Sequence, residues 1–156
     1  MTDVAAPPIV VVGVKDSARS RGAIRLAARE AALRGAGLLA VSAYGADSAL
    51  GAPAGRPLAV VHTAEEERDK AESALRDAVV DALGDQAGPV ATQALPGRGG
   101  RVLVEAARKV NAQLVVLASR DRGSVKPGGV SQYVLRNAPC PVLVVPAAAA
   151  VENQFP

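Results

Sequence analysis

The sequence predicts a single doubly wound α/β domain, with helices on both faces of a five-stranded parallel sheet. Short runs of β-branched and aliphatic residues alternate along the chain with longer segments of helical periodicity. Such alternation is typical of right-handed βαβ crossovers, which place parallel strands side by side. Apolar residues make up 49% of the 156 residues, yet there are only one Phe, two Tyr and no Trp. A core of small branched side chains suits strands that are covered on both faces.

The first helix is predicted between two strands. Residues 9–14 are a β-branched run, which predicts the first strand. Ser17 then precedes a segment in which apolar residues recur at i, i+3, i+4 and i+7 from Ile24, so we expect a helix with one buried face. Gly35 ends this helix, and residues 38–44 form the second strand.

Capping residues predict where the second helix starts. A stretch rich in Gly, Ala and Pro, residues 45–58, shows little pattern and is expected to be a surface loop. Thr63 and Glu66 have the spacing of a capping box, which opens a helix. That helix is expected to stop near Gly84, and residues 89–95 follow as the third strand.

The last third of the chain completes the sheet. We expect a helix over residues 99–110, a strand over 113–118, a basic loop over 119–129, a helix over 130–137 and an edge strand over 142–145. The expected strand order is 3-2-1-4-5. In such a sheet, ligands bind at the carboxyl ends of the strands where the winding reverses, between strands one and four.

The basic loop favours an anion site, because it leaves a parallel strand and feeds a helix N-terminus. Arg120, Arg122 and Lys126 supply three cations, whereas Asp121 places a negative charge where phosphates would sit. Two interpretations stay open. Either these are solvated loop charges, or an arginine held by Asp121 still faces an anion.

Composition argues against several other classes of protein. A net charge of +3 and the scarcity of aromatic rings do not predict binding to nucleic acid or to a membrane. Cys140 is the only cysteine, which excludes an internal disulfide and fits a reducing cytoplasm. The N-terminus lacks the pattern of a signal peptide. His62 is the only histidine, and no set of nucleophile, base and acid emerges, so we expect no enzyme, no catalytic residue and no metal site.

Several motifs, in the right order, resemble the universal stress protein family over about residues 8–146. Residues 11–14, Val-Val-Gly-Val, followed by Ser17, look like the opening strand and turn of the family. Residues 130–146, Val-Ser-Gln-Tyr-Val-Leu-Arg-Asn-Ala-Pro-Cys-Pro-Val-Leu-Val-Val-Pro, are similar to its C-terminal helix and strand almost throughout. The resemblance implies one such domain over residues 8–146, with a flexible start over residues 1–7 and a tail over residues 147–156.

The sequence departs from the motif of the family members that bind ATP. Those members carry Asp and Gly after the first strand, where this chain has Lys15 and Asp16. Two further motif glycines align with Ala118 and Asp121, and the closing pair is Gly128-Gly129 after a shortened loop. The family Asp accepts hydrogen bonds from the ribose hydroxyls, which a lysine cannot do, although Asp16 is an alternative acceptor.

The resemblance therefore implies a dimeric stress-response regulator or adaptor with a weak or lost adenine-nucleotide site, which acts on an unidentified protein partner. The alternative hypothesis is a working sensor of ATP or AMP, with magnesium, whose phosphate loop is rebuilt. Family members commonly pair through the last strand, which would otherwise be an apolar edge. The implied nucleotide-site residues are Val14, Asp16, Ser17, Val41, Ala118, Arg120, Arg122, Gly128, Gly129, Val130 and Ser131, and the implied dimer-interface residues are Val142, Leu143, Val144 and Val145.

Overall fold

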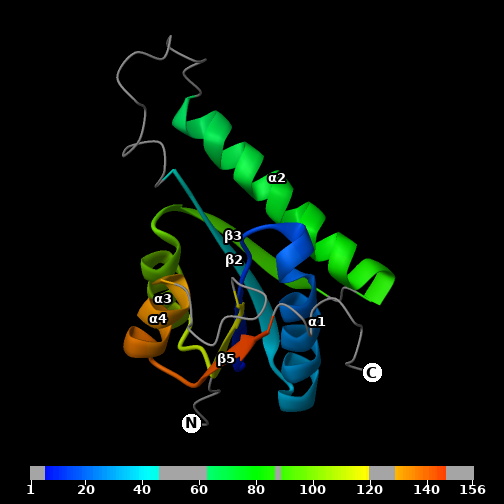
Figure 1. Cartoon of the computed structure of the whole chain (residues 1–156). Coiled ribbons are helices and arrows are strands. Elements are labelled where there is room, and N and C mark those ends of the chain that lie inside the picture. Colours follow the sequence, from blue (N-terminus) through cyan, green and yellow to red (C-terminus); the bar gives the residue numbers. More distant parts are fainter. Residues whose placement is uncertain (1–5, 46–62, 87–88, 120–128, 147–156) are drawn as a thin grey trace.

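The computed structural model describes residues 6–45, 63–86, 89–119 and 129–146, which form a sheet flanked by helices (Figure 1). The predicted loop over residues 45–58, His62 and most of the basic loop thus lie outside the described residues. In chain order the elements are β1 (Ile9–Gly13), α1 (Ser17–Arg34), β2 (Gly37–Gly45), α2 (Ala64–Leu83), a short 3-10 helix η1 (Gly84–Gln86), β3 (Val90–Gly97), α3 (Gly99–Lys109), β4 (Leu114–Ala118), α4 (Gly129–Asn137) and β5 (Val142–Val145).

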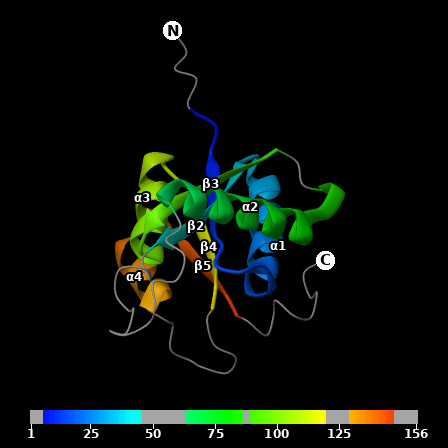
Figure 2. The ribbon, with the colours of Figure 1, turned by 90° about the horizontal axis from the view of Figure 1, so that it is seen from above.

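The sheet has the order β3-β2-β1-β4-β5 with every pair of neighbours parallel, which confirms the predicted doubly wound fold. β1 lies in the middle, where Val11 pairs with Leu39 of β2 on one side and with Val115 of β4 on the other. Figure 2 shows α3 and α4 on one side of the strands and α1 on the other. The winding reverses between β1 and β4, as expected for this topology.

Each face of the sheet has its own hydrophobic core, because alternate strand residues point to opposite faces. On one face, Val10 and Val12 pack with the buried stripes of α1 and α2, including Ile24 and Leu75. On the other face, Val11, Leu39, Val41 and Val115 pack with α3 and with Val134 of α4. All five strands are therefore held between two helical layers.

The start of α1 differs from the prediction by one residue. Ser17 is the first helical residue, and Asp16 is the N-cap, with its Oδ1 accepting a hydrogen bond from the backbone N–H of Arg19 at 2.8 Å. Both residue types cap helices well, so the sequence alone did not separate them. At α2 the predicted capping box is confirmed: Thr63 Oγ1 accepts from Glu66 N–H at 3.2 Å, and Glu66 Oε2 accepts from Thr63 N–H at 3.0 Å.

β3 runs two residues beyond its predicted end at residue 95. Pro96 pairs with Tyr44 and Gly97 pairs with Gly45 of β2. Pro96 is tolerated because β3 is an edge strand, where a missing N–H on the open side removes no ladder hydrogen bond. The extension carries the end of β3 level with the end of β2.

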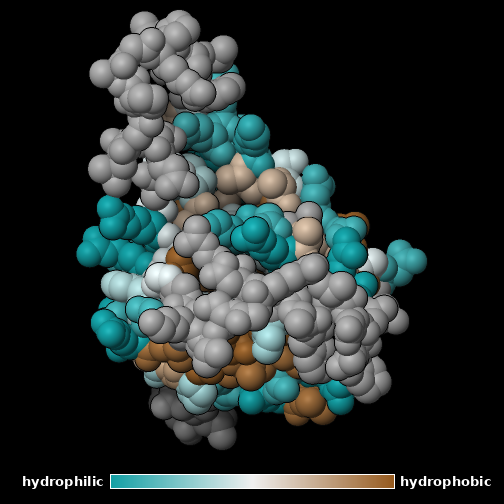
Figure 3. Space-filling view, viewed as in Figure 1, coloured by the Kyte–Doolittle hydropathy of each residue, from teal (hydrophilic) through white to brown (hydrophobic). Residues whose placement is uncertain are grey.

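β5 forms the opposite edge of the sheet. Val142, Leu143 and Val144 are half-buried, and Val145 is buried in the core on the α1 side. In Figure 3, hydrophobic surface gathers in the lower part of the molecule, over β5. Within the described part of the chain, no helix is both long and apolar enough to cross a membrane.

Candidate functional site

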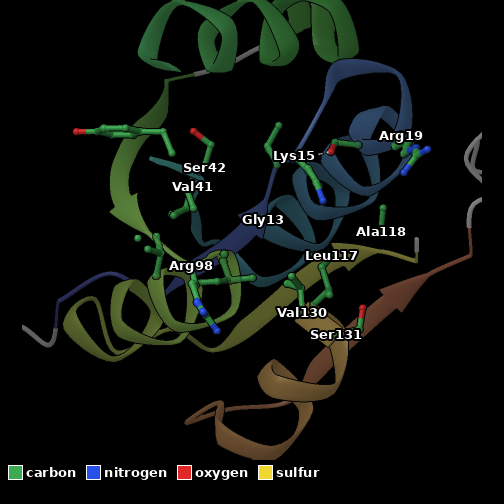
Figure 4. Close-up of a pocket in the computed structure, with 18 of the residues that line it drawn as sticks. Gly13, Lys15, Arg19, Val41, Ser42, Arg98, Leu117, Ala118, Val130 and Ser131 are labelled. Carbon is green, nitrogen blue, oxygen red and sulfur yellow. Dashed lines mark hydrogen bonds between the residues drawn. The ribbon is translucent and has the colours of Figure 1, made fainter. Parts of the chain in front are cut away.

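A cavity of about 460 Å³ opens at the carboxyl ends of β1, β2, β3 and β4 (Figure 4). This is the place where a doubly wound sheet holds its ligands. Its described lining is Gly13, Val14, Lys15, Arg19, Ser20, Val41, Ser42, Ala43, Tyr44, Gly45, Gly97, Arg98, Gly99, Val102, Leu103, Leu117, Ala118, Ser119, Val130 and Ser131.

The inner wall of the cavity is apolar and closely packed. Val41, Leu103 and Leu117 form part of it, and each is at most 4% exposed. A Cβ atom at Gly13 would lie 2.8 Å from Leu103 Cδ2, so any larger residue at this position would force the Leu103 side chain to move. Val14 N–H donates to Val41 O at 2.8 Å and keeps the ends of β1 and β2 together beyond the ladder. The wall suits a flat, largely apolar group such as a nucleobase.

The chain leaves β1 through a turn that is tied to α1. The backbone N–H of Lys15 donates to Ser20 Oγ at 3.1 Å, and Ser20 is only 2% exposed. Asp16 caps α1, and its Oδ2 lies 3.8 Å from Arg19 Nε. This arrangement fixes the backbone of Lys15 at the cavity, while its side chain stays exposed. In Figure 4 the Lys15 side chain extends beside the end of β1.

The charged side chains in the described lining are Lys15, Arg19 and Arg98, and that lining contains no carboxylate. The site can therefore attract an anion, but the residues described there offer no acidic ligand for magnesium. More widely, the described parts of the chain hold no group of three His, Cys, Asp or Glu residues that could bind a metal ion.

Two serines contribute hydroxyl groups to the cavity in different ways. Ser131, in the first turn of α4, is 3% exposed and lines the cavity. Its side-chain hydroxyl makes no hydrogen bond to another described residue. Figure 4 places its oxygen on the side of the cavity next to β4. Ser42 Oγ is buried and likewise finds no partner among the described residues. The Ser131 hydroxyl is thus positioned to donate to a bound anion.

The structure brings together five residues of the predicted nucleotide site. Val14, Val41, Ala118, Val130 and Ser131 all line the cavity, although they come from four different elements or their ends. Arg120, Arg122 and Gly128 lie outside the described residues.

Two other predicted residues, Asp16 and Gly129, are not among the described residues that line the cavity. Asp16 caps α1 and lines a neighbouring hollow beside α2, so its carboxylate is engaged at the helix start. Ser17 and Gly129 are the first residues of α1 and α4.

Sequence reasoning missed Arg98, which enters the cavity from the connection between β3 and α3. The available signal was topological: Arg98 follows a parallel strand, and all such connections open on the same end of the sheet. Lys15 was treated only as a lost acceptor, whereas the structure shows it as one of the cations of the lining.

The doubly wound sheet and the cavity at its switch point define an α/β fold of the class that holds small ligands at this place. The profile of the universal stress protein family matches residues 8–146, so the chain belongs to that family. It is 35% identical over 141 residues to a universal stress protein of Mycolicibacterium smegmatis, and the match covers 87% of this chain but 47% of the relative. The chain thus spans about half the length of that protein.

Solved structures of the same family have the same fold. A universal stress protein in complex with cAMP is 25% identical, with a TM-score of 0.66, and the match covers 92% of this chain and 99% of that one. A universal stress protein from Archaeoglobus fulgidus in complex with dAMP is 24% identical, with a TM-score of 0.65 and coverage of 90% and 98%.

Proposed function

We propose that this universal stress protein acts by binding and not by turnover, and that its cavity takes adenine nucleotides but holds AMP and ATP weakly. The observation that carries the proposal is Lys15 at the mouth of the cavity, at the position where ATP-binding members carry the carboxylate that accepts from the ribose. An ammonium group only donates hydrogen bonds. Free ribose hydroxyls therefore lose their charged acceptor.

The size of this loss can be estimated. A hydrogen bond to a charged group contributes about 1.5–3 kcal/mol, and each 1.4 kcal/mol changes affinity about tenfold. The replacement of the carboxylate thus weakens the site by roughly one to two orders of magnitude. Since the described lining holds no carboxylate to replace it, a site with a dissociation constant of about 1 µM becomes a site in the range of about 0.01–0.1 mM.

The shape of the cavity supports a nucleotide as the class of ligand. Its apolar wall of Val41, Leu103 and Leu117 can receive a base, and Ser131 at the start of α4 can receive a phosphate. The related structure that is 25% identical was solved in complex with cAMP, which is the same class of ligand.

Calorimetric titration with AMP, and with ATP in the presence of magnesium, tests this proposal. We expect heats that do not saturate below about 0.01 mM, in line with the estimated loss of affinity. ATP hydrolysis measured in parallel should stay at the level of the buffer. Saturation at low micromolar AMP, or sustained hydrolysis, would contradict it.

We also propose a homodimer that pairs along β5, as part of a regulator or adaptor in the cytoplasm. Ser119 N–H donates to Val145 O, so the backbone groups of Val145 point toward β4. Because these groups alternate in direction along a strand, those of Val142 and Val144 point to the open edge, which supports the proposal. An edge with free backbone groups and half-buried apolar side chains is a surface on which a second copy can pair.

Light scattering of Val144→Pro tests the dimer. This change removes an N–H on the open edge without removing a bond to β4. We expect the mass of a monomer for Val144→Pro and of a dimer for the wild type. Val80→Lys, which changes an exposed apolar residue on α2, serves as the control and should stay dimeric. A wild-type monomer, or a dimeric Val144→Pro with a native circular dichroism spectrum, contradicts the proposed interface.

A further inference from the structure

The cavity is more cationic than a nucleotide with one 5′-phosphate requires. Lys15, Arg19 and Arg98 line it, and no carboxylate joins them among the described lining residues. Like charges in one concave site repel each other and focus a positive potential there. A bound ligand with several negative charges relieves this repulsion.

The three cations are not equally available. Arg19 lies 3.8 Å from Asp16, which partly neutralises it. Lys15 and Arg98 form no ion pair with any described residue. The two cations without a described counter-ion thus flank the cavity, one after β1 and the other after β3. With β2 between them, their chain positions are separated by roughly 10 Å, two strand spacings.

The N-terminal turns of α3 and α4, which line the cavity, also favour an anion. Neither α3 nor α4 has an acidic residue in its first turn, and Arg98 at the N-cap of α3 forms no side-chain cap. α2 contributes no described residue to the lining and carries Glu65, Glu66 and Glu67 in its first turn, with Glu67 next to Gly45 at the rim. Acidic residues stabilise helix N-termini, so their absence at the cavity leaves the two dipoles open to an anion.

Ser131 supplies an independent indication of where one anion binds. Its side chain is almost completely buried, lines the cavity beside β4 and has no hydrogen bond to another described residue. A phosphate at the start of α4 would accept from this hydroxyl and from backbone N–H groups. Lys15, which follows the neighbouring strand, is then left for a second anionic group.

We propose that the cavity selects nucleotides that carry a second phosphate on the ribose 2′ or 3′ oxygen, in addition to the 5′-phosphate. This inference rests on the proposed function, in which the ribose lies against Lys15. A free hydroxyl needs an acceptor there, whereas a ribose phosphate needs a cation, and Lys15 is a cation. In dinucleotide-binding α/β folds, the same exchange of an acidic for a basic residue accompanies recognition of a ribose 2′-phosphate.

The test compares AMP, ADP, adenosine 3′,5′-bisphosphate and adenosine 2′,5′-bisphosphate by calorimetry on the full-length protein. ADP is the matched control for charge, because its extra phosphate is on the 5′ side. We expect at least one bisphosphate to bind about tenfold or more tightly than both AMP and ADP, the gain of one charge-assisted hydrogen bond.

Three variants test which residue causes the preference for a bisphosphate. Lys15→Gln should remove most of the preference for the bisphosphate over ADP, because it removes the cation that faces the second phosphate. Arg98→Gln should weaken all of the nucleotides to a similar extent, because it acts through the general potential of the cavity. Arg101→Gln, an equal charge change at an exposed position of α3 outside the cavity lining, should change none of them.

The outcomes separate this inference from the proposed function. Three results would overturn the inference and leave weak nucleotide binding intact. These are equal affinity for AMP and both bisphosphates, equal gains in affinity for ADP and the bisphosphates, and an unchanged preference in Lys15→Gln. If no nucleotide binds the wild type, and AMP does not bind Lys15→Asp either, the proposed function fails and the inference fails with it.

Discussion

The backbone N–H of Lys15 donates a hydrogen bond to the side-chain oxygen of Ser20, 3.1 Å away and five residues later in the chain. Ser20 is buried in α1, so this bond couples the position of the cavity lysine to the first turns of the helix. The backbone from which the Lys15 side chain reaches the cavity is therefore anchored to the core of the protein.

Ser20→Ala should destabilise the fold. The variant leaves the Lys15 N–H without its acceptor in a partly buried place, which costs about 1–2 kcal/mol in the free energy of unfolding. Urea denaturation followed by circular dichroism measures this. Ser73→Ala, at an exposed site of α2, is the control and should be neutral or slightly stabilising, because alanine favours helix. Equal effects of the two changes would show that the bond contributes nothing.

Ser42→Ala should not lower the free energy of unfolding, in contrast to Ser20→Ala. Ser42 Oγ is buried and has no hydrogen-bond partner among the described residues, so its removal relieves a desolvation cost. We expect an unchanged free energy of unfolding or a gain of up to about 1 kcal/mol. A loss of more than about 1 kcal/mol would reveal a hydrogen bond to a residue outside the described segments.

Gly100→Ala should destabilise the contact between α3 and α4. A Cβ atom at Gly100 would lie 2.9 Å from Tyr133 Cδ1 and 3.1 Å from Tyr133 Cβ, and the second of these atoms cannot swing away. Overpacking of this kind costs about 1–3 kcal/mol, which exceeds the helix propensity gained.

The matched control for Gly100→Ala is Gly129→Ala, because a Cβ atom there meets no atom of the described residues within 4 Å. Thermal unfolding should show a lower midpoint for Gly100→Ala and an unchanged or higher one for Gly129→Ala. Partial recovery is expected when Tyr133→Ala is added to Gly100→Ala. A stabilised Gly100→Ala would show that the two helices can separate at no cost.

Cys140 should react slowly with alkylating reagents in the folded protein. Burial raises the pKa of its thiol, and a hydrogen bond from the backbone of Val115 opposes this only in part. Because the thiol is an acid, the raised pKa disfavours the reactive thiolate and makes folding less favourable as the pH rises above the pKa of the unfolded chain.

Iodoacetamide labelling across about pH 7–10 checks the prediction for Cys140, since only the thiolate reacts. The midpoint of the rate profile should lie at higher pH for the folded protein than for the chain in urea. A lower midpoint in the folded state would instead indicate an activated cysteine.

The sequence predicted the fold well because its signals were local and mutually consistent. Short runs of β-branched and aliphatic residues predicted the five strands, and the pair Thr63 and Glu66 predicted the start of α2. The misplaced boundaries have physical reasons. Asp16 and Ser17 both favour the N-cap position, and Pro96 is tolerated because its strand lies at the edge of the sheet.

The candidate site was predicted less completely, because its lining is set by tertiary packing. Val41 and Ser131 followed from the resemblance, but Arg98 required knowledge of how far β3 extends. The place of Asp16 also depended on one backbone turn, since its side chain caps α1 and lines the neighbouring hollow.

The central claim is that Lys15 sets the ligand preference by removing the acceptor for a free ribose. Calorimetric titration of AMP into the wild type, Lys15→Asp and the surface control Lys70→Asp tests this most directly. We predict weak binding to the wild type and to Lys70→Asp, and a gain of about tenfold or more for Lys15→Asp. Micromolar binding of AMP to the wild type, or no difference between Lys15→Asp and Lys70→Asp, would contradict the claim.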